Sequence, residues 1–140
     1  FPRERRLKRR DLLRPLFDRA TPGRESLAVG VVRLIWRLVP REATGHAVPL
    51  QAGFAPGRRA RTNAGRTRLR RYMREAFRQH QGPLLLAMGA RPGHTLTLMV
   101  LFRGREDTAS ADLRRDLPRA MDRLARRLSE ADRTPDASAP

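Results

Sequence analysis

The segment GRRARTNAGRTRLRRYMREAFR, residues 57–78, combines a helical apolar repeat with a high density of arginine. Its apolar side chains recur at the i, i+3, i+4, i+7 and i+8 spacing of one helix face, namely Leu69, Tyr72, Met73, Ala76 and Phe77. Such a face buries itself only by packing on another layer of structure. The segment therefore predicts a helix that docks on a sheet, with Asn63 as its N-cap and its end near Gln79.

The other side of this predicted helix is almost purely cationic. An i, i+4 ridge of arginines and two flanking arginines make it up: Arg66, Arg70, Arg74 and Arg78, with Arg68 and Arg71. Like charges at this spacing destabilise a helix by about 0.2 to 0.5 kcal/mol per pair, and Glu75 is the one acid among them. A solvated charged helix normally mixes signs, so this face favours binding to phosphates. Arg58, Arg59 and Arg61 extend the basic surface into the preceding loop.

Composition limits the class of protein. The chain has 140 residues, enough for one modest core, and its formal net charge of +17 points to an anionic partner, nucleic acid first. The absence of cysteine excludes disulfides, thiol catalysis and thiolate metal sites. We find no signal-peptide pattern and no apolar run of membrane-spanning length, so we expect a cytoplasmic protein without membrane contact. A chain beginning at Phe1 is expected to lack its native first residues.

Each of the remaining segments shows either a helical or a strand pattern of apolar residues. We expect a short helix over 9–20 with Pro15 near its first turn, a strand over 26–39, and a strand over 48–54 that pairs with it as a hairpin. An irregular connection over 82–94, with room for a helical turn, leads to a continuous apolar strand over 95–102, expected at the centre of a sheet.

The C-terminal part predicts an amphipathic helix followed by a tail. Ser110 is its candidate cap, Pro118 is expected to kink it or mark its start, and its inward residues are Leu113, Leu117, Met121, Leu124 and Leu128. We expect one domain over residues 1–128 and a disordered tail over 129–140. The fold class is α/β, of the two-layer α+β type, in the order α-β-β-(β)-α-β-α.

The stretch GFAPGRRARTNAGRTRLRRYMREAFR resembles the signature of the bacterial ribonuclease P protein component. Gly53 and Phe54 match its strand end, Arg58 and Arg59 its basic pair, and residues 66–68 its Arg-Asn-Arg element, with Thr67 in place of Asn. The helix then closes with Arg-Glu-Ala-Phe-Arg, as in that family. The N-terminal RLKRRDLLRPLFDRA and the strand LTLMVLFRGRE are also similar to the family, with Leu13 in place of the first Phe of an N-terminal pair.

The resemblance implies a fold and a function. It implies parallel strands joined by a left-handed βαβ crossover through the Arg-rich helix, which is an exception to the right-handed rule. It also implies a protein, monomeric in the holoenzyme, that binds the catalytic RNA through Arg58, Arg59, Arg61, Arg66, Thr67, Arg68, Arg70, Arg71, Arg74 and Arg78. That RNA cleaves precursor tRNA at its 5′ end with Mg²⁺ held mainly by RNA and substrate.

In that family the single-stranded 5′ leader of precursor tRNA lies in a cleft between the first helix and the sheet. Leu13 and Phe17 are the candidates on the helix, and Trp36 and Phe54 are candidates on the sheet, each with a core position as the alternative.

No residue pattern predicts a catalytic or metal site of the chain's own. The three histidines lie far apart in sequence, at His46, His80 and His94, and no P-loop or metal-binding helix motif is present. We therefore expect the chain to be the non-catalytic component of an endoribonuclease. The alternative is a structural RNA-binding protein of the ribosomal-protein type. A DNA-binding protein is a third option, although the sequence shows no clear helix-turn-helix.

Overall fold

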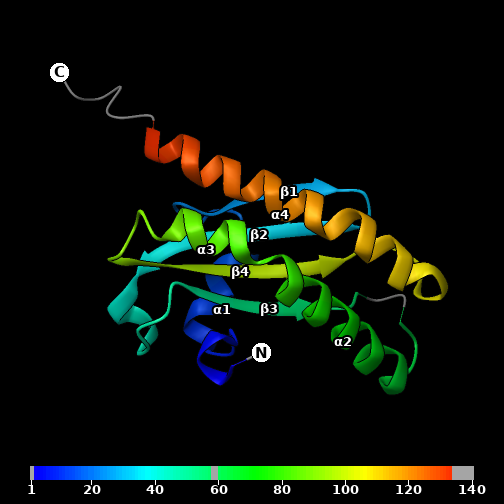
Figure 1. Ribbon diagram of the computed structural model, residues 1–140. Coiled ribbons are helices and arrows are strands. Elements are labelled where there is room, and N and C mark those ends of the chain that lie inside the picture. The colour runs from blue at the N-terminus through cyan, green and yellow to red at the C-terminus, as the bar shows by residue number, and fades with distance from the viewer. Residues whose placement is uncertain (1, 58–59, 134–140) are drawn as a thin grey trace.

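Four strands form one mixed sheet in the order β1-β2-β4-β3 in the computed structural model, which describes residues 2–57 and 60–133 (Figure 1). Their bounds are β1 Glu25–Val29, β2 Val32–Pro40, β3 Leu50–Ala55 and β4 His94–Phe102. β1, β2 and β4 are antiparallel neighbours, while β3 pairs with β4 in parallel. β4 is thus a central strand, which confirms the expectation from its apolar run.

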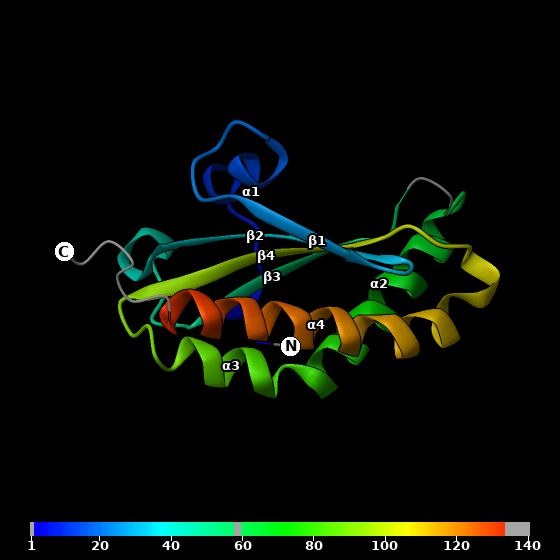
Figure 2. The same cartoon turned by 90° about the horizontal axis from the view of Figure 1, so that it is seen from above.

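Helices cover both faces of the sheet unequally. Their bounds are α1 Arg10–Phe17, α2 Asn63–His80, α3 Gly82–Met88 and α4 Ala109–Arg133. α2, α3 and α4 lie on one face, and α1 lies alone on the other (Figure 2). Short 3₁₀ segments at Arg3–Arg5, Arg41–Thr44 and Glu106–Thr108 connect them.

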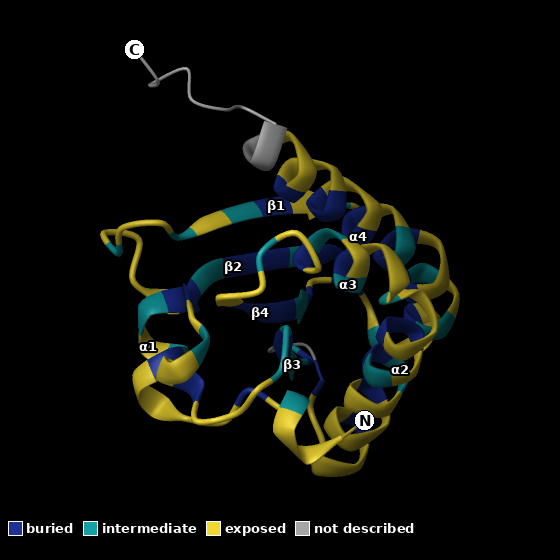
Figure 3. Cartoon of the chain, turned by 60° about the vertical axis from the view of Figure 1, so that its left-hand side comes forward, coloured by how far each residue is buried: buried dark blue, intermediate teal, exposed yellow. Residues whose placement is uncertain are grey.

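Strand alternation divides the apolar residues between two cores. On β4, Leu98 and Val100 point to the large core under α2, α3 and α4, whereas Met99 joins Leu12 and Leu16 of α1 in a smaller one. Figure 3 shows buried strands between helices whose outer sides are exposed. The smaller core leaves part of the α1 face of the sheet uncovered, and a candidate site lies there.

The connection from β3 to β4 is left-handed. In Figure 1 both strands point to the right, α2 and α3 connect them on the viewer's side of the sheet, and β4 lies above β3. Viewed along parallel strands, a right-handed crossover would place the second strand on the opposite side. The structure confirms the crossover that the family resemblance implies, and α2 carries its apolar side into the large core as predicted.

The expected hairpin between 26–39 and 48–54 is wrong. The first of these ranges is itself a hairpin, because a two-residue turn at Gly30 and Val31 separates β1 from β2. Gly30 has φ 56°, which favours glycine, and the carboxylate of Asp116 occupies the space that a side chain would need. Since β1 takes one side of β2 and β4 takes the other, β3 pairs with β4 instead.

Helix boundaries differ from the expectations at several positions. Thr62, not Asn63, caps α2 by accepting a hydrogen bond from the Gly65 N–H at 2.9 Å. Residues 82–88 form the helix α3, which buries Leu84 and Met88, so the expected irregular connection is mostly regular.

The two prolines lie inside helices. Pro15 is in the second turn of α1 and Pro118 is inside α4 rather than at its start, since burial of the neighbouring leucines outweighs one lost backbone bond. Ser110 lies within α4 and its hydroxyl accepts from Arg114, so it is not the N-cap. α4 continues to Arg133, which assigns residues 129–133 to the helix, and residues 134–140 lie outside the described residues.

Candidate nucleic-acid interface

The outer side of α2 presents a dense row of exposed cations. The exposed members are Arg61 in the preceding loop and Arg66, Arg68, Arg70, Arg71 and Arg78, while Arg74 is half-buried. Thr67 is exposed among them. The apolar side anchors this row, because Leu69, Met73 and Phe77 are at most 1 % exposed in the large core. Arg58 and Arg59, which we expected in this surface, lie outside the described residues.

The arginines of α2 are not equally available to a ligand. Arg78 makes a two-bond ion pair with Glu75, at 2.6 and 3.2 Å, and Arg66 donates to the Ala60 carbonyl at 3.1 Å. The Arg78 hydrogen bond lowers the pKa of the Glu75 carboxyl, so the pair stays ionised. Arg68 and Arg70 make no side-chain hydrogen bond or ion pair among the residues that the structure describes, so their guanidinium groups are open to phosphate.

A second cationic site lies on the α1 face of the sheet. A cleft of about 850 Å³ opens at the carboxyl ends of β3 and β4, and its lining is Arg19, Arg33, Ala55, Pro56, Gly57, Leu101, Phe102, Arg103 and Gly104. Arg19, Arg33 and Arg103 have no side-chain partner within the described part of the chain. Three unpaired guanidinium groups around a partly apolar floor suit the backbone of a single-stranded nucleic acid.

Sequence reasoning missed these three arginines. Arg33 shares its sheet face with Ile35 and not with the core residue Leu34, but strand alternation alone does not tell which of these two faces lies toward α1. Arg103 directly follows β4, and its place in the cleft depends on β3 ending beside it. Neither position is visible until the order of the strands is known.

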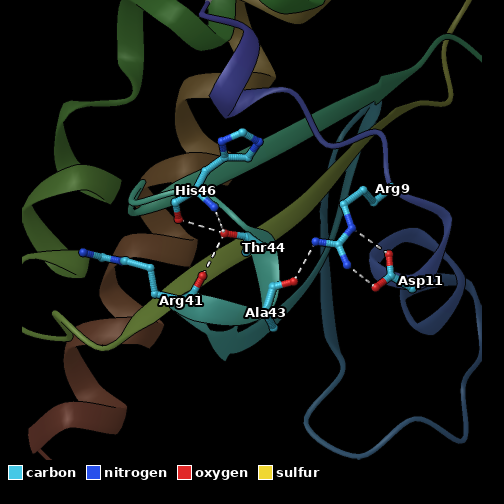
Figure 4. Close-up of polar contacts among 6 residues, drawn as sticks. All are labelled: Arg9, Asp11, Arg41, Ala43, Thr44 and His46. Carbon is cyan, nitrogen blue, oxygen red and sulfur yellow. Dashed lines mark hydrogen bonds and ion pairs between the residues drawn. The ribbon is translucent and has the colours of Figure 1, made fainter.

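Two arginine tethers position α1 above the sheet. At its start, Arg9 donates to the Ala43 carbonyl at 2.9 Å and pairs with Asp11, as Figure 4 shows. Beyond its end, Arg24 donates to the Leu16 carbonyl at 2.7 Å. These contacts join the two ends of α1 to neighbouring loops, in addition to the apolar contacts of the helix with the sheet.

The loop that receives the Arg9 tether is itself held by side-chain hydrogen bonds. The Thr44 hydroxyl lies 2.8 Å from the Arg41 carbonyl and accepts from the His46 N–H at 3.1 Å (Figure 4). Thr44 is 1 % exposed, so its hydrogen bonds are shielded from water.

The aromatic residues separate between the two faces. Phe17 is 55 % exposed at the end of α1, and Leu13 is half-buried beside the smaller core, on the α1 face as expected. Trp36 and Phe54 do not share this face and instead take the core position that was their alternative: Trp36 is 2 % exposed in the large core, and Phe54 packs against that core. Even-numbered positions of β2 point toward α4, where Arg127 lies 5.7 Å from the Trp36 ring, and Phe54 makes an edge contact with Phe77.

α2 begins at the end of the sheet where the cleft opens, so the two cationic surfaces lie near the same end. The cleft ends at Gly57 on β3's side, and α2 begins only a few residues later. A shallow hollow of about 510 Å³ lined by Arg61, Arg105, Glu106 and Asp107 lies near this junction. Arg105 of this hollow lies two residues after Arg103 of the cleft and pairs with Asp107 at 3.3 Å, so the hollow carries both signs of charge.

The described residues offer no group of three histidine, aspartate or glutamate side chains that could hold a metal ion. His46, His80 and His94 remain apart, and the His80 ring is 2.9 Å from the Ala76 carbonyl within α2. In the same part of the chain, no helix has the length and apolar character needed to cross a bilayer.

The fold and its surfaces define a small α+β domain with a mixed sheet, a left-handed crossover and two cationic sites. A solved structure with a similar fold is that of the Staphylococcus aureus RNase P protein, with a TM-score of 0.58 and 12 % sequence identity. The match covers 86 % of this chain and 94 % of that one, so the likeness extends over the whole domain. No protein-family model and no curated protein sequence matches the chain.

Proposed function

We propose that this chain is the protein component of a bacterial ribonuclease P, acting in the cytoplasm in 5′-end maturation of tRNA. The observation that carries the proposal is the presence of both the α2 arginines and the three-arginine cleft on a domain whose fold is similar to that of the S. aureus protein. The proposal assigns one of these surfaces to each of two RNA partners.

The exposed side of α2 binds the catalytic RNA. Arg68, Arg70 and Arg71 project from one rigid helix, so they reach several phosphates of a folded RNA without a large loss of side-chain order. Each phosphate that is neutralised releases counterions, which makes the affinity fall steeply with salt. Glu75 holds Arg78 in place at the far end of this row.

The cleft on the α1 face binds the 5′ leader of precursor tRNA. Arg19, Arg33 and Arg103 contact its phosphates, and the exposed ring of Phe17, close to the end of α1, provides a stacking surface for a base. Since these contacts are to backbone and to an aromatic face, binding is largely independent of leader sequence. The protein supplies no catalytic group; Mg²⁺ held mainly by RNA and substrate phosphates supplies the hydrolytic chemistry.

A binding experiment with matched variants tests the assignment of α2. Arg68→Gln and Arg70→Gln each remove one unpaired cation from the proposed face, and Arg123→Gln removes one from the exposed side of α4. With a bacterial ribonuclease P RNA at moderate salt, we expect each α2 variant to weaken binding several-fold and the α4 variant to match the wild type. Equal affinity for all proteins would refute the assignment.

The same experiment distinguishes a structural RNA-binding protein of ribosomal type. That role predicts binding to an unrelated structured RNA as tight as binding to ribonuclease P RNA. Our proposal predicts a clear preference for ribonuclease P RNA, which disappears first in the α2 variants.

A further inference from the structure

The outer groove between α3 and α4 is an apolar surface that the proposed RNA contacts do not use. The two helices lie side by side on the face of the sheet opposite α1 (Figures 1 and 2). The groove has a volume of about 530 Å³, and its lining is Pro83, Leu86, Ala87, Ala90, Asp122, Ala125, Arg126 and Ser129. Leu86 is 82 % exposed at its edge, although a leucine normally gains by burial.

This groove is close to electrically neutral in a chain of net charge +17. α3 carries no charged residue, and the groove's charged residues are Asp122 and Arg126, of opposite sign and one helical turn apart on α4. Within the described part of the chain neither forms an ion pair or side-chain hydrogen bond, although an i, i+4 pair of this kind can do so. An apolar surface with one acid is a poor site for RNA, so a protein partner fits it better.

We propose that this groove binds the same groove of a second copy of the chain, related by a two-fold axis. When a two-fold axis relates the copies, a residue i of one copy that contacts residue j of the other is matched by j of the first contacting i of the second. The surface must therefore be complementary to itself. The groove has this property: Leu86 projects, Ala90, Ala125 and Ser129 leave space, and both signs of charge lie on one helix. Asp122 of one copy then pairs with Arg126 of the other, twice per dimer.

The dimer is expected to be weak and to strengthen with salt. Eight residues line the groove, whereas a standard interface has about 20 to 30 residues on each side. Each copy also repels the other through its net charge of +17, and this repulsion is screened as ionic strength rises. RNA binding changes with salt in the opposite direction, so the two associations can fail independently. The dimer is one of the free protein, whereas the expectation of a monomer concerns the protein within the holoenzyme.

Sedimentation of the free protein over a concentration series, at low and at high salt, tests for the dimer. We expect a monomer at low salt and a monomer–dimer equilibrium at high salt. Leu86→Glu places a charge where the groove is apolar and is expected to abolish the dimer while leaving the circular dichroism spectrum unchanged, because the side chain is exposed. A wild-type protein that stays monomeric under both conditions would overturn the proposal.

Charge reversal identifies the interface. Asp122→Arg alone and Arg126→Asp alone place like charges opposite each other in a homodimer, and both are expected to weaken it at least tenfold. A mixture of the two variants restores both pairs between unlike chains, and so does the double variant, whose net charge equals that of the wild type. Arg123→Asp changes the net charge by the same amount as Arg126→Asp, at a position outside the groove lining. It is expected not to weaken the dimer. Failure of both the mixture and the double variant to associate would refute the two-fold pairing.

Discussion

Arg33→Gln tests whether the cleft on the α1 face holds the leader. Arg33 lies on β2 opposite Leu101 of β4 and is half-buried at the cleft, without a side-chain partner in the described residues. A hydrogen bond to a charged group contributes about 1.5 to 3 kcal/mol. Because the cleft is open to water, we take the lower end, which corresponds to about tenfold in affinity.

The salt dependence of leader binding gives a second, independent prediction for Arg33→Gln. Each single-stranded phosphate contact contributes about 0.7 to the slope of log affinity against log salt. If Arg19, Arg33 and Arg103 contact one phosphate each, the cleft contributes about 2 to this slope. Arg33→Gln is then expected to lower the slope by about 0.7.

The assay uses the reconstituted holoenzyme and precursor tRNAs with leaders of several nucleotides or of one nucleotide. We expect Arg33→Gln to weaken binding of the long-leader substrate and to leave the short-leader substrate unchanged. Arg123→Gln carries the same charge change on the exposed side of α4 and is the control. An equal loss for both leaders, or an equal loss in the control, would refute the cleft as the leader site.

Three further changes test the local structure. Thr62→Ala removes the cap that accepts from the Gly65 N–H and is expected to lower the free energy of unfolding by about 1 kcal/mol in urea titrations, with recovery in Thr62→Ser. Asp116 accepts from the Val31 N–H at 3.0 Å, and its pKa is lowered, first by its hydrogen bond to the neighbouring arginine. The ionised Asp116 carboxylate therefore stabilises the fold above its unfolded pKa of about 3.9, and this stabilisation is lost as the pH falls below that value. Asp116→Asn is expected to lower the free energy of unfolding by about 1 to 2 kcal/mol at neutral pH and to make stability less dependent on pH in the acid range. An unchanged dependence of stability on pH would contradict this role of Asp116. Arg24→Gln removes the tether beyond the end of α1 and is expected to speed amide exchange in α1 but not in α2; equal exchange in both proteins would show that the apolar contacts alone hold the helix.

The elements that the sequence predicts well are those whose own apolar pattern shows which of their residues are buried. The repeat of α2 and the inward leucines of α4 each belong to one buried face, and β4 is apolar over residues 98–102 because these side chains alternate between the two cores. The strands of the 26–39 range are different. A single strand and a hairpin give the same β-branched composition, and the turn depends on the left-handed backbone of Gly30 and on the distant Asp116.

The candidate interface also has one part that the sequence predicts and one part that it does not. The cations of α2 follow from its helical period, which places Arg68 and Arg70 away from the core without knowledge of the rest of the fold. The cleft depends on which face of β2 looks toward α1, and that parity assigns Arg33 to the cleft and Trp36 to the core. Aromatic character alone could not make this distinction, because a buried ring and a stacking ring have the same sequence signal.

Cleavage of precursor tRNA by a bacterial ribonuclease P RNA at low Mg²⁺, with and without this protein, tests the central claim most directly. We predict that the protein stimulates correct 5′ cleavage of a substrate with a leader of several nucleotides and that the stimulation declines when the leader is trimmed to one nucleotide. No stimulation at a protein concentration that saturates the RNA would contradict the proposed function.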